Sequence, residues 1–151
     1  MNDPHEYFMQ LAIDQALAAG RINEVPVGAL LVDEQGAVIA QDHNRTISNC
    51  DPSAHAEINV LREAAHRLQN YRLLSTTLYV TIEPCAMCMG AAIHARIKRV
   101  VFGAFDPKWG AAESLYQMGR DIRFNHQIEI IHGICEAQCR KVIQDFFRDR
   151  R

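Results

Sequence analysis

His55-Ala56-Glu57, followed at residues 84–88 by Pro84-Cys85-Ala86-Met87-Cys88, is the part of this sequence that decides both its fold and its chemistry. One imidazole and two thiolates can bind a zinc ion, and a carboxylate follows two residues after the imidazole. A structural zinc ion is enclosed by four protein ligands, whereas a catalytic zinc ion keeps one position open for water. A set of three ligands therefore predicts catalysis at this site.

Both halves of the motif fall where the sequence predicts that helices begin. The apolar spacing indicates one helix over residues 54–69 and another over 85–95. His55 would lie in the first turn of one, and Cys85 and Cys88, three residues apart, on one side of the first turn of the other. Helix N-termini favour thiolates over thiols, so two neighbouring N-termini would suit a zinc ion.

The expected ligand charges also favour a catalytic zinc ion. Two thiolates and a neutral imidazole cancel the charge of Zn²⁺, and zinc can lower the pKa of bound water from 15.7 toward about 7. Glu57 would take a proton from that water and deliver it to a ring nitrogen and then to a leaving amine. The alternative is a structural zinc site with a fourth ligand, for which the candidates are His43, Cys50 and His94.

The order of predicted elements indicates an α/β fold. An opening hairpin is followed by strands that alternate with helices, which predicts a three-layer α/β/α sandwich around a mixed five-stranded sheet. The chain has 151 residues, and we expect one zinc-dependent catalytic domain over 1–151. Apart from the two helices above, the sequence predicts helices over 4–19, 114–118 and 135–147, and strands over 27–32, 38–40, 77–81, 100–103 and 128–132.

Composition narrows the setting in which the protein works. A Cys-x-x-Cys pair among five cysteines fits a reducing compartment, and no apolar run reaches the roughly 20 residues of a membrane helix. The N-terminus resembles a helix start rather than a signal peptide, so we expect a cytoplasmic protein. Cys135 and Cys139 are interpreted as small apolar residues.

The net charge of −2 argues against binding any polyanion indiscriminately, although basic residues gather at the C-terminus: Arg140, Lys141, Arg148, Arg150 and Arg151. A basic helix end is also common without any ligand, because it suits the helix dipole.

Motifs beyond the zinc site extend along most of the chain. They include Val25-Pro26-Val27-Gly28-Ala29, His43-Asn44-Arg45, Gln69-Asn70-Tyr71-Arg72-Leu73, Gly110-Ala111-Ala112 and Asp145-Phe146-Phe147-Arg148. With these motifs the chain resembles the bacterial tRNA-specific adenosine deaminases, within the cytidine deaminase-like superfamily. That family converts the wobble-position adenosine of a tRNA anticodon loop to inosine. The resemblance also implies one zinc ion per subunit and a homodimer with its active sites near the interface.

The resemblance assigns expected roles to particular residues. His55, Cys85 and Cys88 correspond to the zinc ligands, and Glu57 to the proton shuttle. Asn44 resembles a residue that contacts the flipped nucleotide, although alone it reads as a turn-forming asparagine. The remaining expected substrate contacts are three pocket walls, Val27, Ala56 and Pro84, and five residues in segments that hold flanking anticodon nucleotides, Asp106, Lys108, Asn125, Phe147 and Arg148.

The sequence departs from the family pattern at Phe105, Trp109 and Glu113. The two aromatic residues could stack on bases or pack against a partner subunit, and the carboxylate adds negative charge where RNA would pass. Two other functions remain open at this point. A deaminase of a free base or nucleoside would use the same zinc motif without needing the basic C-terminus. A zinc module that only binds RNA would show four protein ligands instead of three.

Overall fold

A mixed sheet of five strands, in the order β2-β1-β3-β4-β5, forms the centre of the computed structural model, which describes residues 3–150. The strands are β1 (Gly28–Val32), β2 (Val38–His43), β3 (Thr77–Ile82), β4 (Arg99–Ala104) and β5 (Glu129–Ile131). β1 is antiparallel to β2 and β3, whereas β3, β4 and β5 run parallel to one another. The predicted mixed five-stranded sheet is therefore confirmed.

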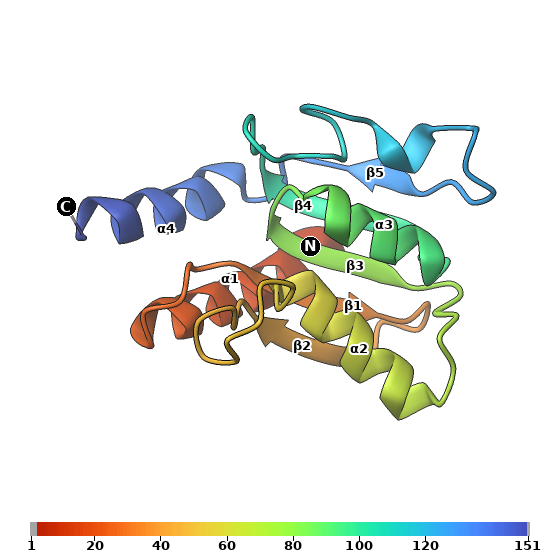
Figure 1. Ribbon diagram of the computed structural model, residues 1–151, viewed down its shortest axis with the longest axis horizontal. Helices are drawn as coiled ribbons and strands as arrows, with labels where there is room; N and C mark the ends of the chain where they lie inside the picture. The colour runs from red at the N-terminus through yellow and green to blue at the C-terminus, as the bar shows by residue number, and fades with distance from the viewer. Residues whose placement is uncertain (1–2, 151) are drawn as a thin grey trace.

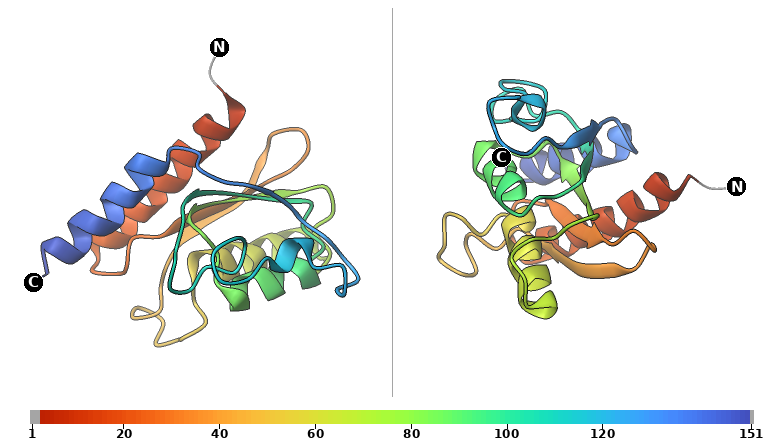
Figure 2. Two further views of the ribbon diagram at one scale, coloured as in Figure 1. Left: turned by 90° about the horizontal axis from the view of Figure 1, so that it is seen from above. Right: turned by 90° about the vertical axis from the view of Figure 1, so that its right-hand side faces the viewer.

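Helices cover both faces of this sheet. Those in the described residues are α1 (Pro4–Arg21), α2 (Ala56–Leu68), α3 (Ala86–His94) and α4 (Glu136–Arg148). α2 and α3 lie on one face, and α1 and α4 lie side by side on the other (Figure 1, Figure 2). This arrangement confirms the α/β/α sandwich. It also places the N-termini of α2 and α3 at the same end of the molecule (Figure 1).

The central strands contribute to two separate cores. Successive strand residues point to opposite faces, so Leu31 and Phe102 join the core under α2 and α3, whereas Leu30 and Val101 join the core under α1 and α4. All five residues of β1 are buried, as is usual when helices cover both faces of a sheet. The sheet is thus a rigid base from which the N-termini of α2 and α3 project.

Close packing of α4 depends on small residues. A Cβ atom at Gly103 of β4 would clash with the Cys139 sulfur, so the glycine is what allows α4 to approach the sheet. Cys139 is buried and Cys135 is partly buried beside the same core. Both therefore pack as the small apolar side chains that the sequence predicts.

Most element ends differ from the predicted ones by one or two residues, and two differences are larger. β2 continues to His43 instead of ending at Ala40, because it keeps pairing with β1 as far as Gly28. The predicted helix over 114–118 is wrong: residues 111–114 form turns, and a single 3-10 turn, η1, follows at Met118–Arg120. The amides of Glu113 and Ser114 donate to a distant carboxylate, so tertiary hydrogen bonds replace the helical ones.

No helix within residues 3–150 combines the length and apolar character that crossing a bilayer requires. Arg151, one member of the predicted basic cluster, lies outside the described residues.

Candidate metal centre and substrate pocket

Two of the three predicted metal ligands occupy equivalent positions at the starts of two helices. His55 is the N-cap residue of α2 and Cys85 is the N-cap residue of α3. Both have extended backbone angles and neither side chain caps its own helix, so both are free to point outward. The sequence predicts both residues inside the first turn, whereas each lies one residue before its helix. Cys88 follows at the third residue of α3 and is buried.

The three ligand atoms have the spacing of a tetrahedral zinc site. His55 Nδ1 lies 3.7 Å from the Cys85 sulfur and 3.6 Å from the Cys88 sulfur, and all three atoms lie within 4.8 Å of one another. Zinc bonds of about 2.3 Å to sulfur and about 2.0 Å to nitrogen, set at tetrahedral angles, would separate the ligands by about 3.5–3.8 Å. The two nitrogen–sulfur distances thus match those expected around one shared zinc ion.

The candidates for a fourth protein ligand are engaged or placed elsewhere. The His43 ring bonds through Nδ1 to the carbonyl oxygen of Asn44 at 2.8 Å, and Cys50 is exposed with its thiol directed to the Ile47 carbonyl. His94 is exposed in the last turn of α3, at the opposite end from Cys85. Among the described residues, only the three predicted ligands meet at this point. This favours the open catalytic arrangement over a closed structural one.

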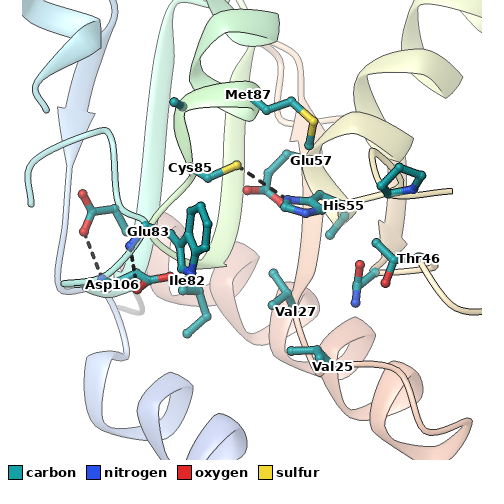
Figure 3. A pocket seen from close by; sticks show the side chains of 15 residues that line it. Val25, Val27, Thr46, His55, Glu57, Ile82, Glu83, Cys85, Met87 and Asp106 are labelled. Carbon is teal, nitrogen blue, oxygen red and sulfur yellow. Dashed lines mark hydrogen bonds between the residues drawn. The ribbon is translucent and has the colours of Figure 1, made fainter. Parts of the chain in front are cut away.

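The ionisable groups at the site influence one another strongly. The Cys88 thiol donates a hydrogen bond to Cys85 and so lowers the pKa of Cys85 to about 4, while the same bond and burial raise the pKa of Cys88. The hydrogen bond with Cys85 raises the pKa of His55. Glu57 is buried in the first turn of α2, and loss of solvation raises the pKa of its carboxyl to about 7. Figure 3 shows its carboxylate beside His55.

A cavity of about 530 Å³ opens over these groups, which is large enough for a nucleoside. Four of the predicted substrate contacts line it: Val27, Asn44, Ala56 and Asp106. Asn44 is buried as a residue, at 7% exposed, but its side-chain amide makes no hydrogen bond within residues 3–150. Every fully buried polar side-chain atom in that part of the chain has a partner, so the amide atoms of Asn44 must face the cavity that the residue lines. Its amide is therefore left available to a ligand in the cavity. Both Met87 and Val27 line the cavity, and Figure 3 shows Met87 above His55 and Val27 below it.

The other predicted contacts lie outside the cavity wall. Pro84 is buried next to the zinc ligand Cys85 and is not among the residues that line the cavity. Its carbonyl oxygen accepts a hydrogen bond of 2.8 Å from the Ala111 amide. Lys108 is exposed next to the cavity, and Phe147 and Arg148 are exposed at the end of α4. Asn125 accepts a hydrogen bond of 3.1 Å from Arg96, just beyond the C-terminal end of α3. It therefore lies away from the zinc ligands.

Glu83 is the main feature of the site for which the sequence suggested no role. Its buried carboxylate holds residues 105–114, here called the strap. It accepts hydrogen bonds from the amides of Asp106 at 3.0 Å, Glu113 at 2.7 Å and Ser114 at 2.8 Å, and from the Ser114 hydroxyl. Figure 3 shows Glu83 beside Asp106. Burial raises the pKa of Glu83, but these hydrogen bonds outweigh it and lower the pKa overall. The only sequence signal was its position immediately before Pro84-Cys85.

A second buried carboxylate holds the loop on the other side of the cavity. Glu24 accepts hydrogen bonds from the amides of Ile47 at 3.2 Å and Ser48 at 2.6 Å and from the Ser48 hydroxyl, within residues 44–55, here called the β2–α2 loop. Burial opposes its ionisation, yet the hydrogen bonds lower its pKa overall. This loop carries Asn44 and ends at the zinc ligand His55.

The fold and the ligand set together define a zinc-dependent deaminase. The family model for the cytidine and deoxycytidylate deaminase zinc-binding region matches residues 2–104. At 47% identity, the chain matches the tRNA-specific adenosine deaminase of Haemophilus influenzae over 97% of its own length and 84% of that protein. The chain therefore belongs to the family of bacterial tRNA-specific adenosine deaminases, and it is a zinc-binding enzyme.

Two solved structures extend this comparison. A tRNA:A34 deaminase, studied for A-to-I editing at the wobble position of transfer RNA, matches with a TM-score of 0.86 and 43% identity, over 90% of this chain and 98% of that chain. The guanine deaminase of Nitrosomonas europaea matches with a TM-score of 0.83 but only 20% identity, over 93% of this chain and 83% of that chain. At that identity the second match shows the shared fold and says nothing about the substrate.

Proposed function

We propose that this enzyme hydrolyses the wobble-position adenosine of a tRNA anticodon loop to inosine, releasing ammonia. The observation that carries the proposal is one cavity that brings together a three-ligand zinc site, a buried carboxylate and an unpartnered amide. High identity to relatives named for this activity supports it over nearly the whole chain.

His55, Cys85 and Cys88 would hold the zinc ion, which supplies a water of lowered pKa. Glu57 then takes a proton from the attacking water and delivers it to N1 of the adenine as the water oxygen bonds to C6. A second proton passes through Glu57 to the exocyclic amine, which leaves as ammonia. Burial of Glu57 suits this role, because a carboxyl group away from bulk water exchanges protons with the substrate rather than with solvent.

The rest of the cavity would orient the base. The Asn44 amide would hydrogen-bond the flipped nucleotide, while Val27 and Ala56 form apolar walls against it. An adenosine in a loop suits such an enclosed site, because a base that is already unpaired costs least to remove from its stack.

We further propose RNA contacts outside the cavity. Asp106 and Lys108 lie on the strap at the cavity rim, and Phe147 and Arg148 on the exposed end of α4, where they would contact flanking nucleotides. The contact predicted for Asn125 would involve RNA farther from the zinc ion. We also propose that the chain acts as a single domain, that it forms a homodimer, and that it works in the cytoplasm.

Product formation from competing substrates tests the proposal. An anticodon stem-loop with adenosine at the wobble position should yield inosine, while free adenosine, cytidine and guanine should not be turned over. Turnover of a free base or nucleoside, with the stem-loop left unchanged, would keep the zinc chemistry but replace the substrate.

Replacing Glu57 separates chemistry from binding. Glu57→Gln should keep zinc and stem-loop affinity but lose about 10²–10⁴-fold in kcat, the usual contribution of a positioned acid–base group. Zinc content, RNA affinity and single-turnover rates measure the three properties separately. A variant that turns over like the wild type would rule out the proton-shuttle role.

A further inference from the structure

Trp109 is an unusual residue to find at the edge of this site. It is the only tryptophan of the chain, it lines the cavity above the zinc ligands, and it is 71% exposed. An indole can bury a large apolar surface, so leaving it in water at the mouth of a cavity forgoes stabilisation of the folded chain. Such a surface is explained if a ligand covers it.

The backbone on both sides of Trp109 is tied to the metal centre. The Trp109 amide donates to the Asp106 carboxylate at 3.2 Å, and the Gly110 amide donates to the Asp106 carbonyl oxygen at 2.8 Å. Gly110 also forms an isolated β-bridge with Cys85, and a Cβ atom at Gly110 would clash with the Glu83 carboxylate. The strap thus fixes the backbone that carries the indole relative to a zinc ligand, which limits the entropy lost when a ligand is bound.

We propose that the Trp109 indole is a stacking surface for the nucleobase next to the target adenosine. This inference rests on the proposed function, because it requires an RNA substrate. When the target base enters the cavity, its neighbour loses a stacking partner and exposes one face at the rim. Aromatic side chains commonly cover such faces in single-stranded RNA.

Stacking on Trp109 would affect which flanking bases are accepted. Every base offers a flat face, so stacking tolerates several bases, whereas hydrogen-bond readout accepts few. The charge of Glu113, which could have repelled RNA here, is paired with Arg120 at 2.9 Å. We therefore expect a graded preference for purines, which overlap more with an indole, over pyrimidines beside the target.

Intrinsic fluorescence reports on this residue directly, because the chain has no other tryptophan. Zinc-loaded Glu57→Gln protein is titrated with the wobble-adenosine stem-loop and with loops that carry an abasic nucleotide on either side of the target. We expect the intact loop to quench the emission and one abasic loop to bind with much less quenching. Equal emission with and without bound RNA would overturn the stacking role.

Kinetics provide an independent test in the active enzyme. Trp109→Ala should raise KM for the stem-loop about tenfold, within the range expected for losing one base stack, and should affect kcat less. Trp109→Phe should restore most of the loss. The matched control is Tyr116→Ala, which removes another aromatic side chain, 61% exposed, that does not line this cavity.

Combining the protein and RNA changes identifies the stacked base. On the abasic loop, Trp109→Ala should raise KM no further, because the partner base is already missing. Two results would overturn the Trp109 inference alone. One is an unchanged KM for Trp109→Ala on the intact loop. The other is that the KM increases from Trp109→Ala and from the abasic nucleotide multiply, whichever side of the target the abasic nucleotide is on. If the wild-type enzyme forms no inosine in the stem-loop, the proposed function and this inference are overturned together.

Discussion

The metal centre and the strap meet at Cys85 but are built in different ways. The metal centre uses two helix N-caps and one residue inside a helix, so regular backbone sets its geometry. The strap has no regular structure, and it is held in place largely by the carboxylate of Glu83. The first therefore determines which reaction can occur. The second carries exposed side chains such as Lys108 and Trp109 at or beside the cavity, where the proposals above place the contacts that select the substrate.

The β2–α2 loop is intermediate between these two regions. Like the strap, it is irregular and held by a buried glutamate, Glu24. Unlike the strap, it ends in a zinc ligand, His55. The two glutamates thus hold similar irregular segments, of which one leads to a zinc ligand and the other carries side chains at the cavity rim. Replacing each glutamate separately therefore distinguishes effects on reactivity from effects on substrate selection.

Removing a zinc ligand should have the largest effect and would test whether the metal centre is needed at all. Cys88→Ala should lose its zinc ion and all measurable deamination, because a catalytic zinc ion needs three protein ligands and only two would remain. The control is Cys139→Ala, which removes another buried thiol, on α4, and should retain zinc and activity. Metal content by mass spectrometry and inosine formation are the measurements. Zinc retained at full occupancy in Cys88→Ala would contradict the assigned ligand set.

Replacing each loop-holding glutamate should have the next largest effect. Glu24→Gln and Glu83→Gln each replace a hydrogen-bonded carboxylate, at a cost of about 2 kcal/mol in the free energy of unfolding at pH 7. Glu83→Gln should mainly raise KM for the stem-loop, since it loosens the strap. Glu24→Gln should mainly lower kcat or zinc affinity, since it loosens the approach to His55. Identical kinetic changes in both variants would remove the distinction between the two loops.

The same two variants should differ from the wild type in their response to acid. The pKa of each carboxyl is lowered from its ordinary value of 4.5 in the folded protein, so this stabilisation is complete above about pH 4.5 and is lost as the pH falls through the folded value. Each variant should therefore be less stable than the wild type at pH 7, with a gap that narrows toward pH 3. Thermal unfolding across that range measures it, and a gap that widens on acidification would contradict the lowered pKa values.

The metal centre was predictable from the sequence, whereas the strap was not. Cys85 and Cys88 are close in sequence, and helix-start signals near them and near His55 placed their side chains without knowledge of the tertiary fold. The hydrogen bonds that define the strap join Glu83 to residues between 106 and 114, and no local pattern records such pairing. The helix predicted over 114–118 failed for the same reason. Local apolar spacing suggested it, but the Ser114 amide donates to the distant Glu83 carboxylate. The amides of Leu115 and Met118 donate to Gly110 and Ala111, five and seven residues earlier, instead of four residues earlier as in a helix.

Arg148, at the far end of α4, should give the smallest effect and would test how far the RNA-contacting surface extends beyond the strap. It is 64% exposed and forms ion pairs with Asp145 at 3.1 Å and Asp149 at 3.3 Å, so its removal should change stability little. Arg148→Ala should raise KM for the stem-loop a few-fold and lower the dependence of log affinity on log salt by about one unit, as expected for one lost phosphate contact.

The control for Arg148 is Arg67→Ala on α2. Arg67 is also exposed, at 58%, and also paired with a carboxylate on its own helix, Glu63. It lies twelve residues beyond His55, about 18 Å along the helix axis from the metal centre. Removing one positive charge there tests whether any lost charge weakens RNA binding. If both variants shift the salt dependence equally, the effect comes from the overall charge of the protein; a shift confined to Arg148→Ala would place a phosphate at the end of α4 and extend the substrate-selecting surface from the strap to that helix.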